Sequence, residues 1–350
     1  MVVGSEAELV DLLRRREGPA FVRGGGTRGI LAGKGEALET SGLAGVRVYE
    51  PGALTLVAGA GTALAEVEAV LAGERQRLIF EPPDYRALLG WQGVSTIGGV
   101  VASGFSGPRR VQGGAVRDHV LGLRFVNGAG VAVKAGGRVM KNVTGLDIAK
   151  LLVGSHGRLG VITEVALRVQ ALPEAEVTLV GERALPEGLA ALRAALASPY
   201  DVSGAGYAGG RAMLRIEGMA GSVAYRAGAL RTRLGGDWEV VEGEGSTNIW
   251  RELRDVTDFA GRPGNVWRVS VPPTEAEGLV TGLEAEALFD WGGGLVWLLA
   301  PPHVDVRARV KRGHATLVRG EGVVFHPEPP EVARLTEGLR EKFDPKGIFG

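Results

Sequence analysis

The stretch FVRGGGTRG, residues 21–29, sets three consecutive glycines between two arginines, directly after a short apolar run. A backbone without Cβ atoms can adopt φ > 0 and turn its N–H groups toward one point, which makes a cradle for an anion such as phosphate. The stretch is neither a P-loop, which would continue with Lys-Ser or Lys-Thr, nor a dinucleotide fingerprint that opens a long helix. By itself it is equally compatible with a tight turn, since the chain holds 57 glycines.

Two more glycine-dense turns occur in the first half of the chain, GGVVASGFSG at residues 98–107 and GSHGRLG at residues 154–160. Small hydroxyl residues border the three turns: Thr27, Thr96, Ser103, Ser106 and Ser155. Glycines allow a backbone to approach a ligand closely, while hydroxyls and free N–H groups can bond its oxygens. Three such turns can line an extended molecule with a pyrophosphate in its middle and polar rings at both ends. That description fits FAD.

Composition narrows the class of protein. A length of 350 residues predicts two domains, with room to bury a ligand between them. The formal net charge of zero, without a long basic run, argues against a nucleic-acid partner. The sequence has no cysteine, which excludes disulfides, iron–sulfur clusters and thiol catalysis in this chain. Redox chemistry would therefore need an organic cofactor or a metal without thiolate ligands.

The apolar segments of the sequence predict where in the cell the protein lies. No run of 18 or more apolar residues occurs, so we expect no membrane-spanning segment. The opening MVVGSEAELVDLLRRR is typical of a strand and then a helix, with Ser5 as N-cap and Glu8 three residues later, and not of a signal peptide. We expect a cytoplasmic protein, which is compatible with attachment to the inner membrane through partners.

The order of elements predicts an α+β fold. Residues 1–171 alternate short strands with helices, whereas residues 172–325 give the order strand, helix, strand, strand, helix, strand twice. Helices are expected there at 185–197, 222–236, 274–286 and 304–312, with a connecting helix at 246–259. This order predicts two tandem βαββαβ (ferredoxin-like) units.

Five motifs, in their order along the chain, resemble a known family. They are RGGGTRG (23–29), TIGGVVASGFSGPRR (96–110), GAVRDHVLGLRFV (114–126), GGRVMKNVTGLDIAKLLVGSHGRLGVITEV (136–165) and LREKFDPKGIF (339–349). Together they resemble the FAD-binding (PCMH-type) domain of the vanillyl-alcohol oxidase superfamily, and within it the smaller FAD-binding component of bacterial glycolate oxidases. The resemblance implies an FAD domain of two α+β subdomains at 1–171, a cap domain at 172–325 and a C-terminal segment, 326–350, that returns to the FAD domain.

The resemblance also implies which residues contact FAD. The pyrophosphate turn falls on Gly24, Gly25, Gly26, Thr27, Arg28 and Gly29. The second flavin loop falls on Pro82, Thr96, Gly98, Gly99, Ser103, Ser106 and Gly107, with Arg109 close by. The third region, which meets the adenosine half, falls on Gly154, Ser155, Gly157, Gly160, Val161 and Ile162. Members that bind FAD covalently carry a histidine near the first turn, where this chain has Thr27 and Arg28, so we expect non-covalent FAD.

The chemistry that the resemblance implies is hydride transfer from the α-carbon of a 2-hydroxy acid to the flavin, which needs a base and a cation for the carboxylate. His314 is the candidate base; the alternative is a structural hydrogen-bonding role. Arg268 is the candidate carboxylate ligand; the alternative is an exposed position at a sheet edge.

Two classes of function remain open. The first is the FAD-binding subunit of a glycolate (2-hydroxy acid) oxidase complex that passes electrons to a larger FAD-containing subunit and an iron–sulfur subunit. The second is a non-catalytic flavin-carrying or assembly subunit, favoured because the H-x-H-x-G-D-G-N segment of the larger relatives is missing. An NADPH-using reductase of cell-wall synthesis is a more distant third. The five histidines show no H-x-H or H-x-x-x-H spacing, so we expect no metal site.

Overall fold

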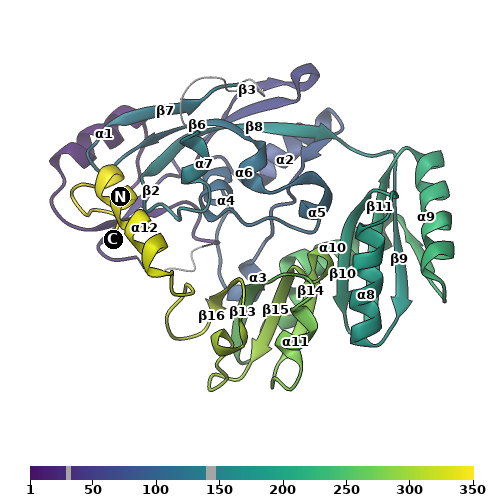
Figure 1. The fold of residues 1–350 in the computed structure, drawn as a ribbon. Coiled ribbons are helices and arrows are strands. Elements are labelled where there is room, and N and C mark those ends of the chain that lie inside the picture. The colour runs from purple at the N-terminus through teal and green to yellow at the C-terminus, as the bar shows by residue number, and fades with distance from the viewer. Residues whose placement is uncertain (29–32, 139–146) are drawn as a thin grey trace.

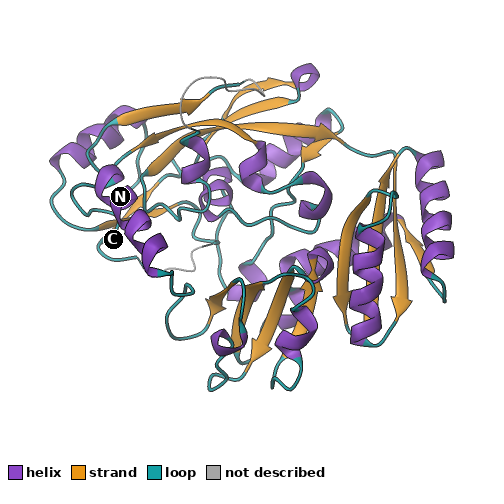
Figure 2. Cartoon of the chain, in the orientation of Figure 1, coloured by secondary structure: helices purple, strands orange, loops and turns teal. Residues whose placement is uncertain are grey.

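The computed structural model describes residues 1–28, 33–138 and 147–350, and Figures 1 and 2 show their arrangement. They form a six-stranded, an eight-stranded and a two-stranded sheet with helices packed against them, which confirms the predicted α+β class. Residues 172–174 connect β8 (Val161–Ala171) to β9 (Ala175–Glu182). We call the elements α1 to β8 the N-terminal half and the elements β9 to β16 the C-terminal half.

The six-stranded sheet is built around β8. Its order is β3 (Val46–Glu50), β4 (Thr55–Gly59), β8, β6 (Val120–Val126) and β7 (Ala132–Gly136), and β5 (Gln76–Leu78) pairs with the far end of β8. The β8 sequence VITEVALRVQA is rich in β-branched residues, which suit a central buried strand, and β4 and β6 pair antiparallel to it.

Helices cover this sheet from below in the view of Figure 1. They are α2 (Leu64–Gly73), α4 (Ile97–Ser103), α6 (Val116–His119) and α7 (Ala149–Leu152), and their apolar side chains form one cluster with those of the strands. Shorter pieces complete the N-terminal half: η1 (Pro51–Ala53), α3 (Arg86–Leu89) and α5 (Arg110–Gly113).

Residues near position 350 pack against the first helix and strand of the chain. Helix α1 (Glu6–Arg15) starts as predicted, with the Ser5 hydroxyl accepting a hydrogen bond from the Glu8 amide at 3.1 Å. Strands β1 (Ala20–Arg23) and β2 (Glu36–Glu39) form a parallel pair. After α12 (Pro330–Phe343), Ile348 and Phe349 are buried in the apolar cluster of α1 and β1, and the Ala20 amide donates to the Ile348 carbonyl at 2.8 Å.

The C-terminal half is one continuous sheet with the order β12-β9-β11-β10-β14-β15-β13-β16. Its further strands are β10 (Val202–Ala208), β11 (Arg211–Gly218), β12 (Glu239–Glu242), β13 (Asn265–Ser270), β14 (Glu286–Asp290), β15 (Leu295–Ala300) and β16 (His314–Arg319). Helices α8 (Leu185–Leu196), α9 (Ala220–Leu234) and α11 (Ala276–Val280) share an apolar cluster with one face of the sheet. The two groups of four strands join where β10 pairs with β14.

Two expected helices differ from the structure. Residues 304–312 form only the 3-10 turn η4 (Arg307–Arg309), because Asp305 accepts from the amides of Arg307 and Ala308 and three valines disfavour a helix. The helix expected at 274–286 shrinks to α11 because Gly282 adopts φ +69°. The connecting helix α10 (Gly243–Asp255) ends at Val256, whose φ of +55° separates it from η2 (Thr257–Phe259).

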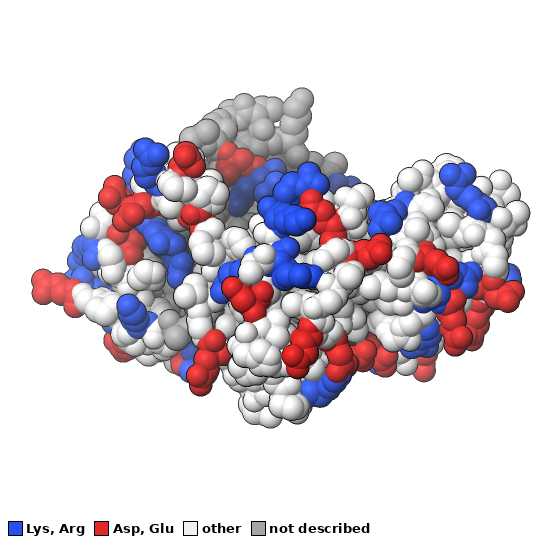
Figure 3. All heavy atoms as spheres, turned by 60° about the horizontal axis from the view of Figure 1, so that its bottom comes forward, with Lys and Arg blue, Asp and Glu red and all other residues white. Residues whose placement is uncertain are grey.

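The second face of the eight-stranded sheet turns toward the N-terminal half. Its apolar cluster combines Trp250 of α10 and Trp297 of β15 with Tyr85, Leu88 and Phe105 of the N-terminal half. The tryptophans at 250, 267 and 297 are buried. On the side of the molecule that Figure 3 shows, acidic and basic side chains are interspersed. Within the described residues, no helix is long and apolar enough to cross a membrane.

Candidate functional site

The first glycine turn is locked against the segment that precedes α4. A Cβ atom on Gly25 would lie 1.5 Å from the Val94 carbonyl oxygen, and one on Gly24 would lie 2.5 Å from Thr96 Oγ1. Gly26 has a φ of +70°, which favours glycine directly. From the sequence, we expected these glycines to allow close approach of a ligand. The structure shows that they allow close approach of a neighbouring loop. Gly29 lies outside the described residues.

The second loop is held by bonds within the protein. Thr96 caps α4 by accepting from the Gly99 amide at 3.3 Å, and Gly98 donates to the Ala60 carbonyl at 2.8 Å. Ser103 donates to the Val100 carbonyl, and Ser106 accepts from the Val116 amide. These side-chain oxygens therefore already shape the loop. Pro82 is buried beside it, and Gly107 donates to the Phe80 carbonyl at 2.9 Å.

The third turn completes a ring of contacts. A Cβ atom on Gly104 would lie 3.1 Å from the Gly154 Cα, and one on Gly157 would lie 2.9 Å from the Val22 Cβ beside the first turn. Ser155 donates to the Leu152 carbonyl, while Gly160, Val161 and Ile162 lead into β8. The structure thus brings the three glycine turns together, although 130 residues separate the first glycine, Gly24, from Gly154.

Arg28 supplies the charge beside these turns. Only 6% of its surface is exposed, and Nε and Nη2 donate to the Ser95 hydroxyl at 3.2 and 3.1 Å. Burial lowers the pKa of Arg28 to about 10, so the guanidinium stays positive near neutral pH. Its Nη1 is buried without a hydrogen-bond partner among the described residues. A buried, unsatisfied cation favours an anion at this point, which fits the diphosphate of FAD.

A second buried arginine lies across from the loop, on β13. The Arg268 guanidinium lies 5.2 Å from the ring centre of Phe105 and 5.3 Å from that of Trp291. Strand β13 runs between β15 and β16, and Arg268 is only 7% exposed, so the alternative of an exposed position at a sheet edge is wrong. Arg268 forms no ion pair with any described residue, and burial lowers its pKa.

Aromatic side chains from both halves surround Arg268. The Tyr85 ring lies 5.7 Å from Phe105 and 5.4 Å from Trp297, centre to centre. Trp291, in η3 (Trp291–Gly293), donates from its indole nitrogen to the Gly107 carbonyl at 3.1 Å. We call Tyr85, Phe105, Arg268, Trp291 and Trp297 the aromatic cluster. It meets the second glycine loop at Phe105 and Gly107.

His314 lies at the exposed edge of the same face. It pairs with Ser270 and its neighbour Thr316 pairs with Arg268, so alternation along the strands puts His314 and Arg268 on one side of the sheet. Desolvation, and then the positive charges of Arg268, His326 and Arg110, lower the pKa of His314 below its usual 6.5. A neutral imidazole near pH 7 is the state that a general base requires.

Three further histidines have other neighbours. His156 is partly buried against Phe105 and Phe325, and desolvation lowers its pKa to about 4. His119 stacks on Phe80 and bonds to the Gly113 carbonyl, while His303 faces Glu284 on the surface. Among the residues that the structure describes, no group of three or more histidine, aspartate and glutamate side chains could hold a metal ion.

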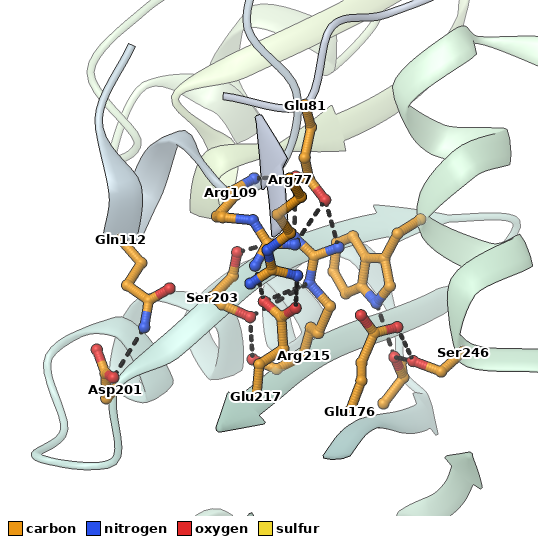
Figure 4. A network of polar contacts seen from close by, with 12 residues as sticks. Arg77, Glu81, Arg109, Gln112, Glu176, Asp201, Ser203, Arg215, Glu217 and Ser246 are labelled. Atoms are coloured by element: carbon orange, nitrogen blue, oxygen red, sulfur yellow. Dashed lines mark hydrogen bonds and ion pairs between the residues drawn. The ribbon is translucent and has the colours of Figure 1, made fainter. Parts of the chain in front are cut away.

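Arg109 belongs to a network that joins the two halves (Figure 4). Its guanidinium pairs with Glu217 of β11 and, at 3.1 Å, with Glu81. Arg215 bonds Glu81 through both terminal nitrogens, at 2.8 and 2.9 Å, and Arg77 pairs with Glu217 at 2.7 Å. We call Arg77, Glu81, Arg109, Arg215 and Glu217 the ion cluster. The role of Arg109 as an FAD contact stays a prediction, because its charge is directed to this cluster.

Both carboxylates of the ion cluster are ionised near neutral pH. Burial alone would raise the pKa of Glu81, but Arg215 and Arg109 hold it at about 2. The same opposition of burial by Arg215, Arg109 and Arg77 leaves the pKa of Glu217 well below its usual value. Sequence reasoning missed this cluster, although Arg215 and Glu217 alternate with apolar residues in RAMLRIEG (211–218) and so had to share one face. It also missed Tyr85, for which the PPDY turn gave no specific signal.

Comparison with known proteins agrees with the geometry. The family described as "FAD binding domain" matches residues 2–136. The glycolate oxidase subunit GlcE of Escherichia coli K12 is 36% identical over 337 residues, which cover 95% of this chain and 91% of that protein. The glycolate oxidase subunit GlcD of Bacillus subtilis 168 is 37% identical over 102 residues, 29% of this chain and 21% of that protein.

Solved structures extend the agreement to the fold. A structure of alkyldihydroxyacetonephosphate synthase matches with a TM-score of 0.72 and covers 100% of this chain and 75% of that one. At 16% sequence identity this likeness concerns the fold alone. Together with the FAD-binding match, it confirms the predicted superfamily fold.

Proposed function

The chain belongs to the family of the glycolate oxidase subunit GlcE and is an FAD-linked oxidoreductase subunit, and we propose that it oxidises a small 2-hydroxy acid such as glycolate. FAD is its cofactor. In this proposal residues 1–171 hold FAD, residues 172–325 form a cap that carries the substrate groups, and residues 326–350 return to the FAD domain. When bound, FAD supplies the acceptor for the hydride of the substrate α-carbon.

The three glycine turns would hold the cofactor without a covalent bond. Backbone N–H groups of Gly24, Gly25 and Gly26 and the guanidinium of Arg28 would face the diphosphate. Residues of the second loop, from Thr96 to Gly107, would face the flavin, and residues 154–162 the adenosine. The unpaired Nη1 of Arg28 is the observation in favour of an anion here.

The single observation that carries the substrate proposal is Arg268. A buried guanidinium without a carboxylate partner among the described residues has a strong preference for an anionic ligand. The carboxylate of a 2-hydroxy acid would supply it. His314, on the same side of the sheet, would take the proton of the substrate hydroxyl.

The electrons would leave through a partner. This chain has no cysteine, so an iron–sulfur relay would have to lie in another subunit. Relatives carry the names of two different glycolate oxidase subunits, GlcE and GlcD. We therefore propose a complex with a larger FAD-containing subunit and an iron–sulfur subunit.

The test uses the purified chain and its visible spectrum. Glycolate and then D-lactate are added without oxygen, and bleaching of the oxidised flavin bands is expected. A flavin that stays oxidised with both acids would reject catalysis by this chain and favour the flavin-carrying or assembly role. The absence of an H-x-H-x-G-D-G-N segment from the sequence is the observation in favour of that second function.

A further inference from the structure

Besides Arg268, the aromatic cluster contains a second polar group, the Tyr85 hydroxyl, whose proton has no acceptor among the described residues. Tyr85 is 2% exposed, yet its hydroxyl donates no hydrogen bond to a carbonyl or carboxylate of the described residues. The other fully buried tyrosine, Tyr207, does donate one, to the Arg183 carbonyl at 2.9 Å, and the half-buried Tyr49 donates to Gln76 at 3.1 Å. Buried tyrosine hydroxyls usually have an acceptor, so the free proton of Tyr85 marks a place for a ligand atom.

Tyr85 and Arg268 share their neighbours. Trp297 is the register partner of Arg268 on β15, and the Tyr85 ring lies 5.4 Å from it. Phe105 contacts both side chains, at 5.2 Å from the guanidinium carbon of Arg268 and 5.7 Å from the ring centre of Tyr85. The two groups therefore belong to one small site with aromatic walls.

Charge supports this placement. Burial raises the pKa of Tyr85, and the nearby cations Arg268 and Arg28 only partly oppose it. The phenol thus stays protonated near neutral pH and can donate a hydrogen bond. Burial lowers the pKa of Arg268, and the Tyr85 oxygen partly opposes this effect. Since a guanidinium offers only donors, it leaves the Tyr85 proton without an acceptor.

We infer that Tyr85 donates a hydrogen bond to the substrate carboxylate beside Arg268 and thereby selects small carboxylates. This inference rests on the proposed oxidation of a 2-hydroxy acid. The guanidinium supplies charge and the phenol supplies direction. Phe105, Trp291 and Trp297 leave apolar walls around the carbon chain, so a short substrate is favoured over a long or branched one.

The experiment titrates the FAD-loaded protein with oxalate, a small dicarboxylate that cannot donate a hydride from an α-carbon. Changes in the oxidised flavin spectrum give its dissociation constant. Tyr85→Phe should weaken oxalate binding about tenfold or more, because it removes a hydrogen bond to a charged acceptor. Tyr49→Phe is the matched control: it removes a bonded hydroxyl on β3, outside the aromatic cluster, and should leave the oxalate constant unchanged.

A second measurement separates binding from structure. Since the Tyr85 hydroxyl has no acceptor among the described residues, Tyr85→Phe should keep its FAD content and its melting temperature. A lower melting temperature, or an unchanged oxalate constant, would overturn the inference. If wild-type protein bleaches with glycolate but Tyr85→Phe binds oxalate equally well, the inference alone fails. If wild-type protein neither bleaches nor binds oxalate, the proposed function fails with it.

Discussion

Buried arginines lie at two places between the N-terminal and C-terminal halves, and they differ in whether carboxylates accompany them. In the ion cluster, Arg77, Arg109 and Arg215 all pair with Glu81 or Glu217. In the aromatic cluster, Arg268 has rings as neighbours and forms no ion pair with a described residue. Paired charges fix the position of one half against the other, whereas an unpaired charge is kept for a ligand.

The same contrast holds for cost. A buried ion pair is compensated within the fold, and its main effect appears when one partner is removed. A buried lone cation destabilises the empty protein, and the ligand that neutralises it recovers this free energy on binding. Mutations in the two regions should therefore change different properties. Mutations in the ion cluster should lower stability, whereas mutations in the aromatic cluster should lower ligand binding or turnover.

The largest effect is expected at the turn that carries Arg28. In Gly25→Ala the new Cβ would lie 1.5 Å from the Val94 carbonyl oxygen, so the two loops must separate and FAD should not be retained. The flavin content after gel filtration measures this loss. Gly228→Ala in α9 is the control, because nothing lies within 4 Å of its Cβ, and it should bind FAD normally. Full flavin occupancy in Gly25→Ala would refute the assignment of the turn.

Glu217→Gln tests whether the ion cluster stabilises the fold. It leaves the buried guanidiniums of Arg77 and Arg109 short of a counter-charge, so the free energy of unfolding should fall by about 3 kcal/mol. Urea unfolding measures the change. Glu286→Gln, which removes the partner of Arg262 on the surface, should cost much less, because both side chains are exposed to solvent. Equal costs for the two variants would contradict the structural role of the ion cluster.

Arg268→Met tests whether Arg268 acts on the substrate. It keeps much of the side-chain volume but removes the charge, so kcat/KM for glycolate should fall about 100-fold. The melting temperature should not fall, because no ion pair with a described residue is lost. Arg312→Met, at an exposed arginine that pairs with Glu275, serves as the control for the loss of one positive charge. A variant that unfolds easily but turns over normally would reverse our assignment.

The ion cluster should also make the stability of the fold depend on pH in the acidic range. The pKa of Glu81 is lowered in the folded state to about 2, so its pairing stabilises the fold at pH values above the ordinary 4.5. This contribution is lost as the pH falls from 4.5 toward 2. Unfolding measured across this window should show a smaller pH dependence in Glu81→Gln than in the wild type. Identical profiles would mean that Glu81 does not contribute.

The last prediction concerns the pH dependence that His314 should cause. Its pKa is lowered from 6.5, so the ring is neutral at pH 7, and kcat/KM should decline only when the pH falls below 6.5. His314→Gln should lower the rate and remove this acidic limb. If the limb survives in the variant, another group is the base and His314 has the structural role that the sequence left open.

The sequence allowed prediction of local features and of motif order. The cap at Ser5 and the long strand β8 are determined by nearby residues, and the motif order identified the family. The partners of charged side chains were not predictable. Arg77, Arg109 and Glu217 are far apart in the chain, and only packing of the two halves brings them together. The expected helix at 304–312 failed because Asp305 bonds locally to backbone amides.

The return of the chain to β1 also has a consequence for protein synthesis. Strand β1 emerges from the ribosome early, but the Ile348 carbonyl that accepts from the Ala20 amide emerges only after both large sheets have been translated. Ile348 and Phe349 also complete the apolar cluster of α1. The packing that supports the first glycine turn is therefore completed only after residue 349 has been synthesised, and stable flavin uptake should follow that step.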